Sequence, residues 1–198
     1  MDARPQRAAM LLGTVVLVAA FAIHGARATP ESQAQPSAQD GPSAIPSAWQ
    51  HHKAEFDYFG VTTLYTCDGL EGQVRRILEY LGARKDMHVQ ARGCPGPANA
   101  PSHTASVVAD FYSLAPSTDA SEANAVKAQW STVELTGRRP NFMGDGDCEL
   151  IDAMKTLISQ NFRPRDLNYR TTCIPRELEI DGFAVKGEFL HAIPVKPG

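Results

Sequence analysis

The four cysteines of this 198-residue chain are the residues whose chemistry can be judged most directly from spacing: Cys67, Cys94, Cys148 and Cys173. No two of them form a C-x-x-C pair, so neither a redox motif nor a zinc knuckle is present. In an exported chain, four cysteines predict two disulfides, with more than one possible connectivity. Because thiols at helix starts generally have a lowered pKa, a catalytic cysteine remains an alternative.

Two further clusters carry groups that could bind a metal ion. His51 and His52 are adjacent, and Asp145, Asp147 and Glu149 lie together in GDGDCE. The histidines have no third ligand at a recognisable spacing, and the acids do not follow the pattern of a calcium loop. Acids at this position more simply complement the start of a helix. No phosphate-binding loop or dinucleotide fingerprint is present either, so we expect neither a metal ion nor a cofactor.

The segment TGRRPNF, residues 136–142, is the candidate binding loop. It combines Arg138 and Arg139 with Asn141 and Phe142. Loops on a rigid scaffold often carry function, so these four residues are predicted to contact an acidic partner. The alternative is a solvated loop without a binding role.

An internal repeat predicts the elements that position these residues. When Cys67 is aligned with Cys148, apolar residues coincide three, ten and fourteen places further on. The match continues from VVADFYSLAP (107–116) to VKGEFLHAIP (185–194). Each copy has a helical apolar pattern between strand-like segments, so we expect a β-α-β-β unit used twice, over about residues 55–116 and 128–194. The alternative is two unrelated stretches with ordinary amphipathic patterning.

The repeat also predicts the disulfides and the fold class. It favours Cys67–Cys94 and Cys148–Cys173, each joining the start of a helix to the end of the next strand, and pairing between the copies is the rival. The first copy has one extra residue before its second cysteine, which predicts a bulge at Gly93. We expect an α+β fold in which both units share one largely antiparallel sheet, with two helices packed on one face. Two separate small sheets are the alternative.

The N-terminus reads as a targeting segment followed by a linker. Residues 1–28 have a basic start, an apolar stretch and the A-x-A site Ala26-Arg27-Ala28, so they are predicted to be a signal peptide, with an uncleaved anchor as the alternative. Residues 29–48, rich in Pro, Ser, Ala and Gln, are predicted to be a disordered tether. Residues 49–198 would then form one α+β domain.

The charge of the chain argues against one class of partner. The formal net charge is −3, and removal of residues 1–28, which carry three arginines and one aspartate, leaves −5. This mild negative charge argues against binding to nucleic acid. No other apolar run approaches the length of a membrane span, so we expect the mature form not to cross a membrane.

The segments FDYFGVTTLYTCDGLEGQVRRILEYLGAR (56–84), GDCELID (146–152) and TTCIP (171–175) resemble an uncharacterised family of short exported bacterial proteins. Their Y-[ST]-C-D-G-L element is the most specific part of the match. The resemblance implies a periplasmic or secreted location and brings no activity or catalytic residues with it.

Because no convergent catalytic set is visible, the sequence favours a non-enzymatic binding, accessory or inhibitor-like module that recognises a protein or another envelope component. An exported hydrolase with an Asp/Arg/His site is one alternative. A periplasmic metal-binding protein that uses His51 and His52 is another. The loops that differ between the copies, residues 94–103 and 137–146, are where we expect function. The sequence gives no indication of the oligomeric state.

Overall fold

The computed structural model describes residues 43–94, 100–117 and 125–194. The predicted signal peptide and most of the predicted tether lie outside these residues. The elements follow in the order β1 (Ile45–Phe59), α1 (Cys67–Tyr80), β2 (His88–Arg92), β3 (Thr104–Pro116), β4 (Ala125–Thr136), η1 (Asp145–Asp147), α2 (Cys148–Ala153), α3 (Lys155–Phe162), β5 (Arg165–Thr171) and β6 (Phe183–Ala192). No helix of the described segments is both long and apolar enough to cross a membrane.

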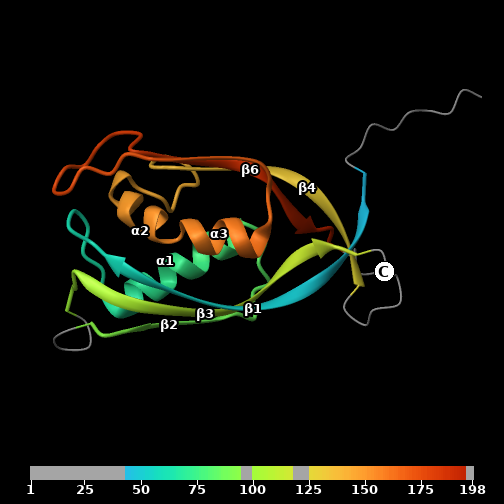
Figure 1. The fold of residues 1–198 in the computed structure, drawn as a ribbon, viewed down its shortest axis with the longest axis horizontal. Helices are drawn as coiled ribbons and strands as arrows, with labels where there is room; N and C mark the ends of the chain where they lie inside the picture. The colour runs from blue at the N-terminus through green and yellow to red at the C-terminus, as the bar shows by residue number, and fades with distance from the viewer. Residues whose placement is uncertain (1–42, 95–99, 118–124, 195–198) are drawn as a thin grey trace, which may run out of the picture. The chain divides into compact units, whose positions relative to one another are not determined.

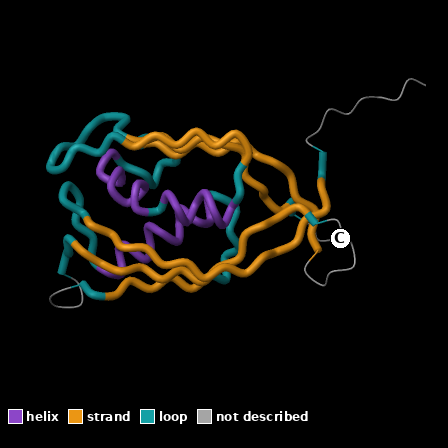
Figure 2. The backbone as a smooth tube through the Cα atoms, viewed as in Figure 1, coloured by secondary structure: helices purple, strands orange, loops and turns teal. Residues whose placement is uncertain are grey.

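The strands form one six-stranded sheet in the order β2-β3-β1-β4-β6-β5, and every neighbouring pair is antiparallel. The predicted α+β class with an antiparallel sheet is therefore confirmed. The central pair, β1 and β4, is joined only between Ile45–Ala48 and Ala125–Ala128. Beyond this junction the two strands diverge into two arms, and the helices lie between the arms (Figure 1; Figure 2).

The first strand begins earlier than the composition indicates. It starts at Ile45 and ends at Phe59, so it includes residues 45–48, which the sequence assigns to the tether. Pro46 and Ser47 are typical of a linker, but here they are paired with β4, and Ser47 is also paired with β3. Pairing on both sides satisfies the backbone of this segment and outweighs its low strand propensity.

The helix α1 has one buried face and well-defined ends. Leu70, Val74, Ile77 and Leu78 are buried at helical spacing. The side chain of Thr66 accepts a hydrogen bond from the Gly69 N–H (3.0 Å) and caps the first turn.

The last turn of α1 ends at Gly82. This residue has φ +99°, and the N–H groups of Gly82 and Ala83 bond back to the carbonyls of Glu79 and Leu78. This pair of bonds is the Schellman motif, which stops the helix at a left-handed residue.

The second helical segment is interrupted, where the sequence predicts one continuous helix. It consists of α2 and α3, separated at Met154. The Met154 N–H is shared between the carbonyls of Leu150 and Ile151, which tightens the backbone locally. The segment ends at Arg163, a non-glycine residue with φ +45°.

A single large core unites both halves of the sheet with the helices. Its largest fully buried side chains include Tyr58, Phe111, Phe183 and Phe189. A second small cluster lies where the arms join, and it includes Leu114, Ala128 and Leu190, with Trp49 and Trp130 packed against it.

An arginine lies over each of these two tryptophans. The guanidinium of Arg84 is 5.7 Å from the ring centre of Trp49, and that of Arg165 is 4.1 Å from the ring centre of Trp130. These cation–π contacts occur at equivalent places in the two halves.

The disulfides of the structure are Cys67–Cys94 and Cys148–Cys173, and no cysteine of the described residues is free. These are the same two pairs that the repeat favours. Each bond ties the first residue of a helix to a residue just after the next strand, β2 or β5.

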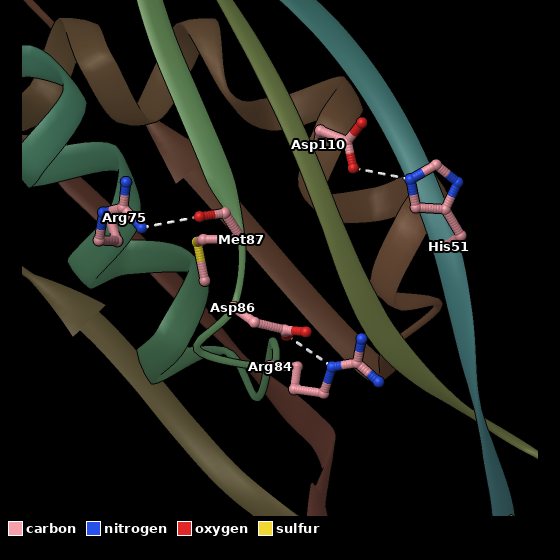
Figure 3. A network of polar contacts seen from close by, with 6 residues as sticks. All are labelled: His51, Arg75, Arg84, Asp86, Met87 and Asp110. Atoms are coloured by element: carbon pink, nitrogen blue, oxygen red, sulfur yellow. Dashed lines mark hydrogen bonds and ion pairs between the residues drawn. The ribbon is translucent and has the colours of Figure 1, made fainter. Parts of the chain in front are cut away.

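Helix side chains also bond to the strand that each disulfide reaches. In the first half, Glu71 accepts from the Ala91 N–H (2.8 Å) and Arg75 donates to the Met87 carbonyl (2.8 Å; Figure 3). In the second half, Asp152 accepts from the Thr171 hydroxyl (2.6 Å). Glu71 and Asp152 both lie four residues after their cysteine, so an acid at the same helix position bonds to each strand, to a backbone N–H in the first half and to a side-chain hydroxyl in the second.

The predicted bulge at Gly93 is wrong. The register of β2 with β3 runs without a shift to Arg92, and Gly93 follows the strand with φ +76°. The irregularity lies in β5 instead, between Arg165 and Asn168, where Asp166 has φ +49°. The side-chain alternation is therefore adjusted at the start of β5 and not at the end of β2.

Candidate binding surface

The predicted binding loop follows β4 as a tight turn. Thr136 and Arg139 each donate a backbone hydrogen bond to the other's carbonyl (2.8 and 3.3 Å), and the Arg139–Pro140 bond is cis. The side chains of Arg138, Arg139 and Asn141 are exposed. They are accessible to a partner, so their binding role stays a prediction.

The fourth residue of that set, Phe142, is half-buried and packs inside the molecule. Its ring lies edge-on to Tyr80 (6.0 Å between centres), and the guanidinium of Arg76 lies 5.5 Å from its centre. Its carbonyl also accepts a hydrogen bond from Gln73 (3.2 Å). All three partners belong to α1, so Phe142 anchors the loop to that helix.

Asp147 and Glu149 of GDGDCE bind different partners, and Oδ1 of Asp145 is buried without a hydrogen-bond partner. Asp147 is 6% exposed and accepts hydrogen bonds from Tyr65, from Gln73 (3.0 Å) and from the Gly144 N–H (2.8 Å). Burial and the charge of Asp147 raise the pKa of Tyr65 above its ordinary value. The partners of Asp147 are thus a phenol, an amide and a backbone N–H, with no histidine among them, and the carboxylate ties the second half to the first.

Glu149 makes a second connection between the halves, at the open end of the arms. It accepts from the N–H groups of Val61 (2.8 Å) and Thr62 (3.0 Å) and from the Thr62 hydroxyl (3.1 Å). The same hydroxyl oxygen accepts from the Arg176 N–H (3.0 Å). Residues 60–66, between β1 and α1, are therefore held against residues 172–182, between β5 and β6.

Gly146, in η1, lies close to the first of these segments. A Cβ atom at this position would lie 2.3 Å from the hydroxyl oxygen of Thr63, so a larger residue would push η1 away from residues 60–66. The second nearest side chain, Leu178, belongs to residues 172–182, so Gly146 lies beside both segments.

The adjacent histidines do not act together. His51 pairs with Asp110 (2.7 Å; Figure 3), whereas His52 bonds to Ser113 (2.9 Å), because successive residues of a strand point to opposite faces. Burial, followed by the charges of His51 and Arg163, lowers the pKa of His52. Within residues 43–94, 100–117 and 125–194, no group of three or more His, Cys, Asp or Glu side chains is placed to hold a metal ion.

Among the described residues, five large hydrophobic side chains are exposed. Four belong to the two segments that Glu149 and Thr62 hold together, and the fifth is Phe59, the last residue of β1 just before the first segment. We call them the apolar rim: Phe59 (65% exposed), Leu64 (41%), Ile174 (43%), Leu178 (68%) and Ile180 (63%). Both segments lie at the open end of the arms, opposite the β1–β4 junction (Figure 1). Large apolar side chains that are exposed at one end of a chain are typical of a contact site.

A hollow of about 440 Å³ lies beside the rim, between the end of β1, the helix α2 and the second disulfide. Phe59, Val61, Ala153 and Pro175 give it an apolar lining. Asp57 and Asp152, both exposed, add carboxylates to the same lining. The hollow thus combines apolar surface with negative charge.

The charged residues of the rim itself are mainly acidic. Glu177, Glu179 and Asp181 alternate with the rim residues of the β5–β6 connection, against the single base Arg176 within it. Arg170 also reaches this connection, where it donates to the carbonyl of Asp181 (3.1 Å). Acidic groups therefore outnumber basic ones around the rim.

The rim was missed when the sequence was read by itself. Leu178 and Ile180 alternate with Glu179 and Asp181, a pattern that also fits a half-buried strand. The alternation by itself does not distinguish a strand from an exposed connection. The distinction needs the segment that packs beside residues 172–182. That neighbour, residues 60–66, is more than a hundred residues away in the chain.

Comparison with known proteins gives no match, whether against protein-family models, curated proteins or solved structures.

Proposed function

We propose that this chain is an exported, disulfide-stabilised binding or accessory module of the bacterial envelope, without enzymatic activity of its own. The apolar rim is the observation that carries this proposal, because exposed clusters of large hydrophobic side chains mark interaction sites. Two disulfides are consistent with an oxidising compartment such as the periplasm.

The rigidity of the rim supports a binding role over a disordered connection. The Cys148–Cys173 bond fixes one end of residues 172–182, and the Arg176 N–H bonds to Thr62 within the same segment. A segment held in one conformation loses little entropy when it binds. The rim therefore has the properties of a preformed contact surface.

Capture from an envelope fraction tests the proposal. The mature chain, residues 29–198, is compared with the variant Leu178→Ser/Ile180→Ser and with the matched variant Arg138→Ser/Arg139→Ser. We expect a stoichiometric partner with the unmodified chain, loss of that partner in the rim variant, and retention in the arginine variant. Thermal unfolding of all three proteins checks that the substitutions leave the fold intact.

Two results would contradict the proposal. Loss of the partner only in the arginine variant would assign binding to the loop at Arg138 and Arg139 instead of the rim. Absence of any partner, together with turnover of a substrate by the purified chain, would make the protein an enzyme.

We also infer that the two halves are copies of one β-α-β-β unit, with their helices covering the same face of the sheet. The equivalent disulfides, the equivalent Trp–Arg contacts and the equivalent helix acids Glu71 and Asp152 support this inference. Trp49 and Trp130 lie 81 residues apart, the same offset as Cys67 and Cys148. Homologous sequences tested half against half would show the copies most clearly, and a failure to align above chance would refute the inference.

A further inference from the structure

We propose that the apolar rim and the hollow beside it bind a polypeptide segment of a partner protein that carries lysine or arginine among apolar residues. This proposal rests on the proposed function and adds the chemistry of the partner.

The apolar part of the partner follows from the exposed side chains. Phe59, Leu178 and Ile180 are each more than 60% exposed, although they are among the most hydrophobic residue types. Removing this surface from water is favourable in proportion to its area. The hollow beside Phe59 provides a concave site that a side chain of the partner can enter.

The basic part follows from the charges. Asp57 and Asp152 line the hollow and are exposed, and Glu177 and Asp181 are exposed along the rim, whereas one carboxylate oxygen of Glu179 is buried. The carboxylate of Glu149 is already bonded to Val61 and Thr62, and that of Asp152 accepts one hydrogen bond, from the Thr171 hydroxyl. On the basic side, Arg176 and Arg170 reach the rim segment, and Arg92, which is bonded to Gln90, lines a neighbouring hollow with Asp57 and Phe59. A lysine or arginine of the partner would complement the excess of carboxylates, and would also find the ring of Phe59 beside Asp57.

The same charges argue against two other occupants. A second copy of this chain would place acidic rim against acidic rim, which costs free energy through like-charge repulsion. The surface of a bacterial membrane is rich in anionic lipid and would be repelled for the same reason. The apolar side chains by themselves would suit any of these occupants, so the carboxylates decide among them.

Peptide binding tests the proposal with defined probes. The probes are a short labelled peptide that alternates leucine with lysine and a matched peptide that alternates leucine with glutamate. We expect saturable binding of the lysine peptide to the mature chain and much weaker binding of the glutamate peptide. The variant Asp57→Asn/Asp152→Asn should weaken the lysine peptide about fivefold, from the loss of two partly exposed charge contacts. Glu134→Gln, in β4 and outside the hollow and the rim, is the control and should leave binding unchanged.

The remaining measurements distinguish the possible outcomes. The rim variant Leu178→Ser/Ile180→Ser should remove binding of the lysine peptide, and high salt should weaken it. Equal affinity for both peptides, or equal loss with Glu134→Gln, would overturn the charge preference. Rim-dependent binding to phosphatidylcholine or phosphatidylglycerol vesicles without peptide binding would overturn it in favour of a lipid surface, and rim-dependent dimerisation would assign a second copy. If the rim variant loses its envelope partner but no peptide binds, only the proposed partner chemistry fails and the binding function stands.

Discussion

The two halves of the sheet share one frame but differ at their open ends. In each half a disulfide joins the helix start to a residue just after the next strand, and an arginine beyond the helix lies over a tryptophan of the first strand. The residue before the first cysteine of each pair shows the difference. Thr66 caps its own helix, whereas Asp147 accepts hydrogen bonds from Tyr65 and Gln73 of the other half.

The molecule thus has two kinds of contact, those within each half and those between the halves. Contacts within a half are local and equivalent, and they hold the frame. Among the contacts between the halves, those of the Asp147 and Glu149 carboxylates have no counterpart in the first half, and Glu149 lies at the end that carries the apolar rim. The candidate binding surface thus lies where the two halves are least alike.

The largest expected effect comes from removing the disulfides one at a time. The double variants Cys67→Ser/Cys94→Ser and Cys148→Ser/Cys173→Ser should each lower the free energy of unfolding by about 3.5 kcal/mol, because the bonds close loops of similar length (separations of 27 and 25 residues). Chemical denaturation measures this cost. Hydrogen exchange within residues 174–182 should become fast only in the second variant, and equal protection of this segment in both would contradict its role in holding the rim.

Substitutions before the two helices compare the contact between halves with the local cap. Asp147→Ala should cost about 3 kcal/mol, since it leaves the buried donors of Tyr65 and Gln73 without an acceptor. Thr66→Ala, at the equivalent position, should cost about 1 kcal/mol through loss of the helix cap. Equal costs in denaturant titrations would show that Asp147 does no more than cap its own helix.

The helix ends offer a pair of changes with opposite signs. Gly82→Ala should destabilise by about 2 kcal/mol or more, because φ is +99° and the new Cβ would lie 2.4 Å from the Leu190 carbonyl oxygen. Arg163→Gly, at the equivalent place in the second half, should stabilise by about 0.5 kcal/mol by relieving a left-handed conformation. Thermal melts of both variants measure the signs, and a destabilised Arg163→Gly would mean that the arginine side chain contributes more than its backbone costs.

The smallest effect concerns Ser113 and His191, which occupy equivalent places in the two last strands. Ser113 bonds to His52 and Asn161, whereas Nε2 of His191 is buried without a partner and burial lowers the pKa of this histidine. The folded chain then binds the proton less readily than the unfolded chain, so stability is complete above the ordinary histidine pKa and falls as the pH decreases through it. The melting temperature should therefore drop from pH 7.5 to pH 5.5.

His191→Gln tests the origin of this pH dependence. It should reduce the drop without removing it, because His52 also has a lowered pKa. An unchanged pH dependence in this variant would exclude His191 as a source.

The features that the sequence predicts well are those set by local patterning. The spacing of Leu70, Val74 and Ile77 indicates the helix, and the aligned positions of the cysteines indicate the disulfide Cys67–Cys94. The start of β1 was missed because Pro46 and Ser47 are strand residues only through their partners in β4. The rim was missed for the same reason. The contact of Glu149 with Val61 and Thr62 joins residues more than 80 positions apart, so no local pattern in the sequence indicates it.

The most direct measurement of the central claim is photo-crosslinking in an exporting bacterium. A photo-reactive phenylalanine analogue is placed at position 178, in the apolar rim, or at position 141, in the loop after β4; both side chains are exposed. If the rim is the contact surface, position 178 gives a discrete crosslinked protein and position 141 gives none. A discrete product from position 141 alone would contradict the account.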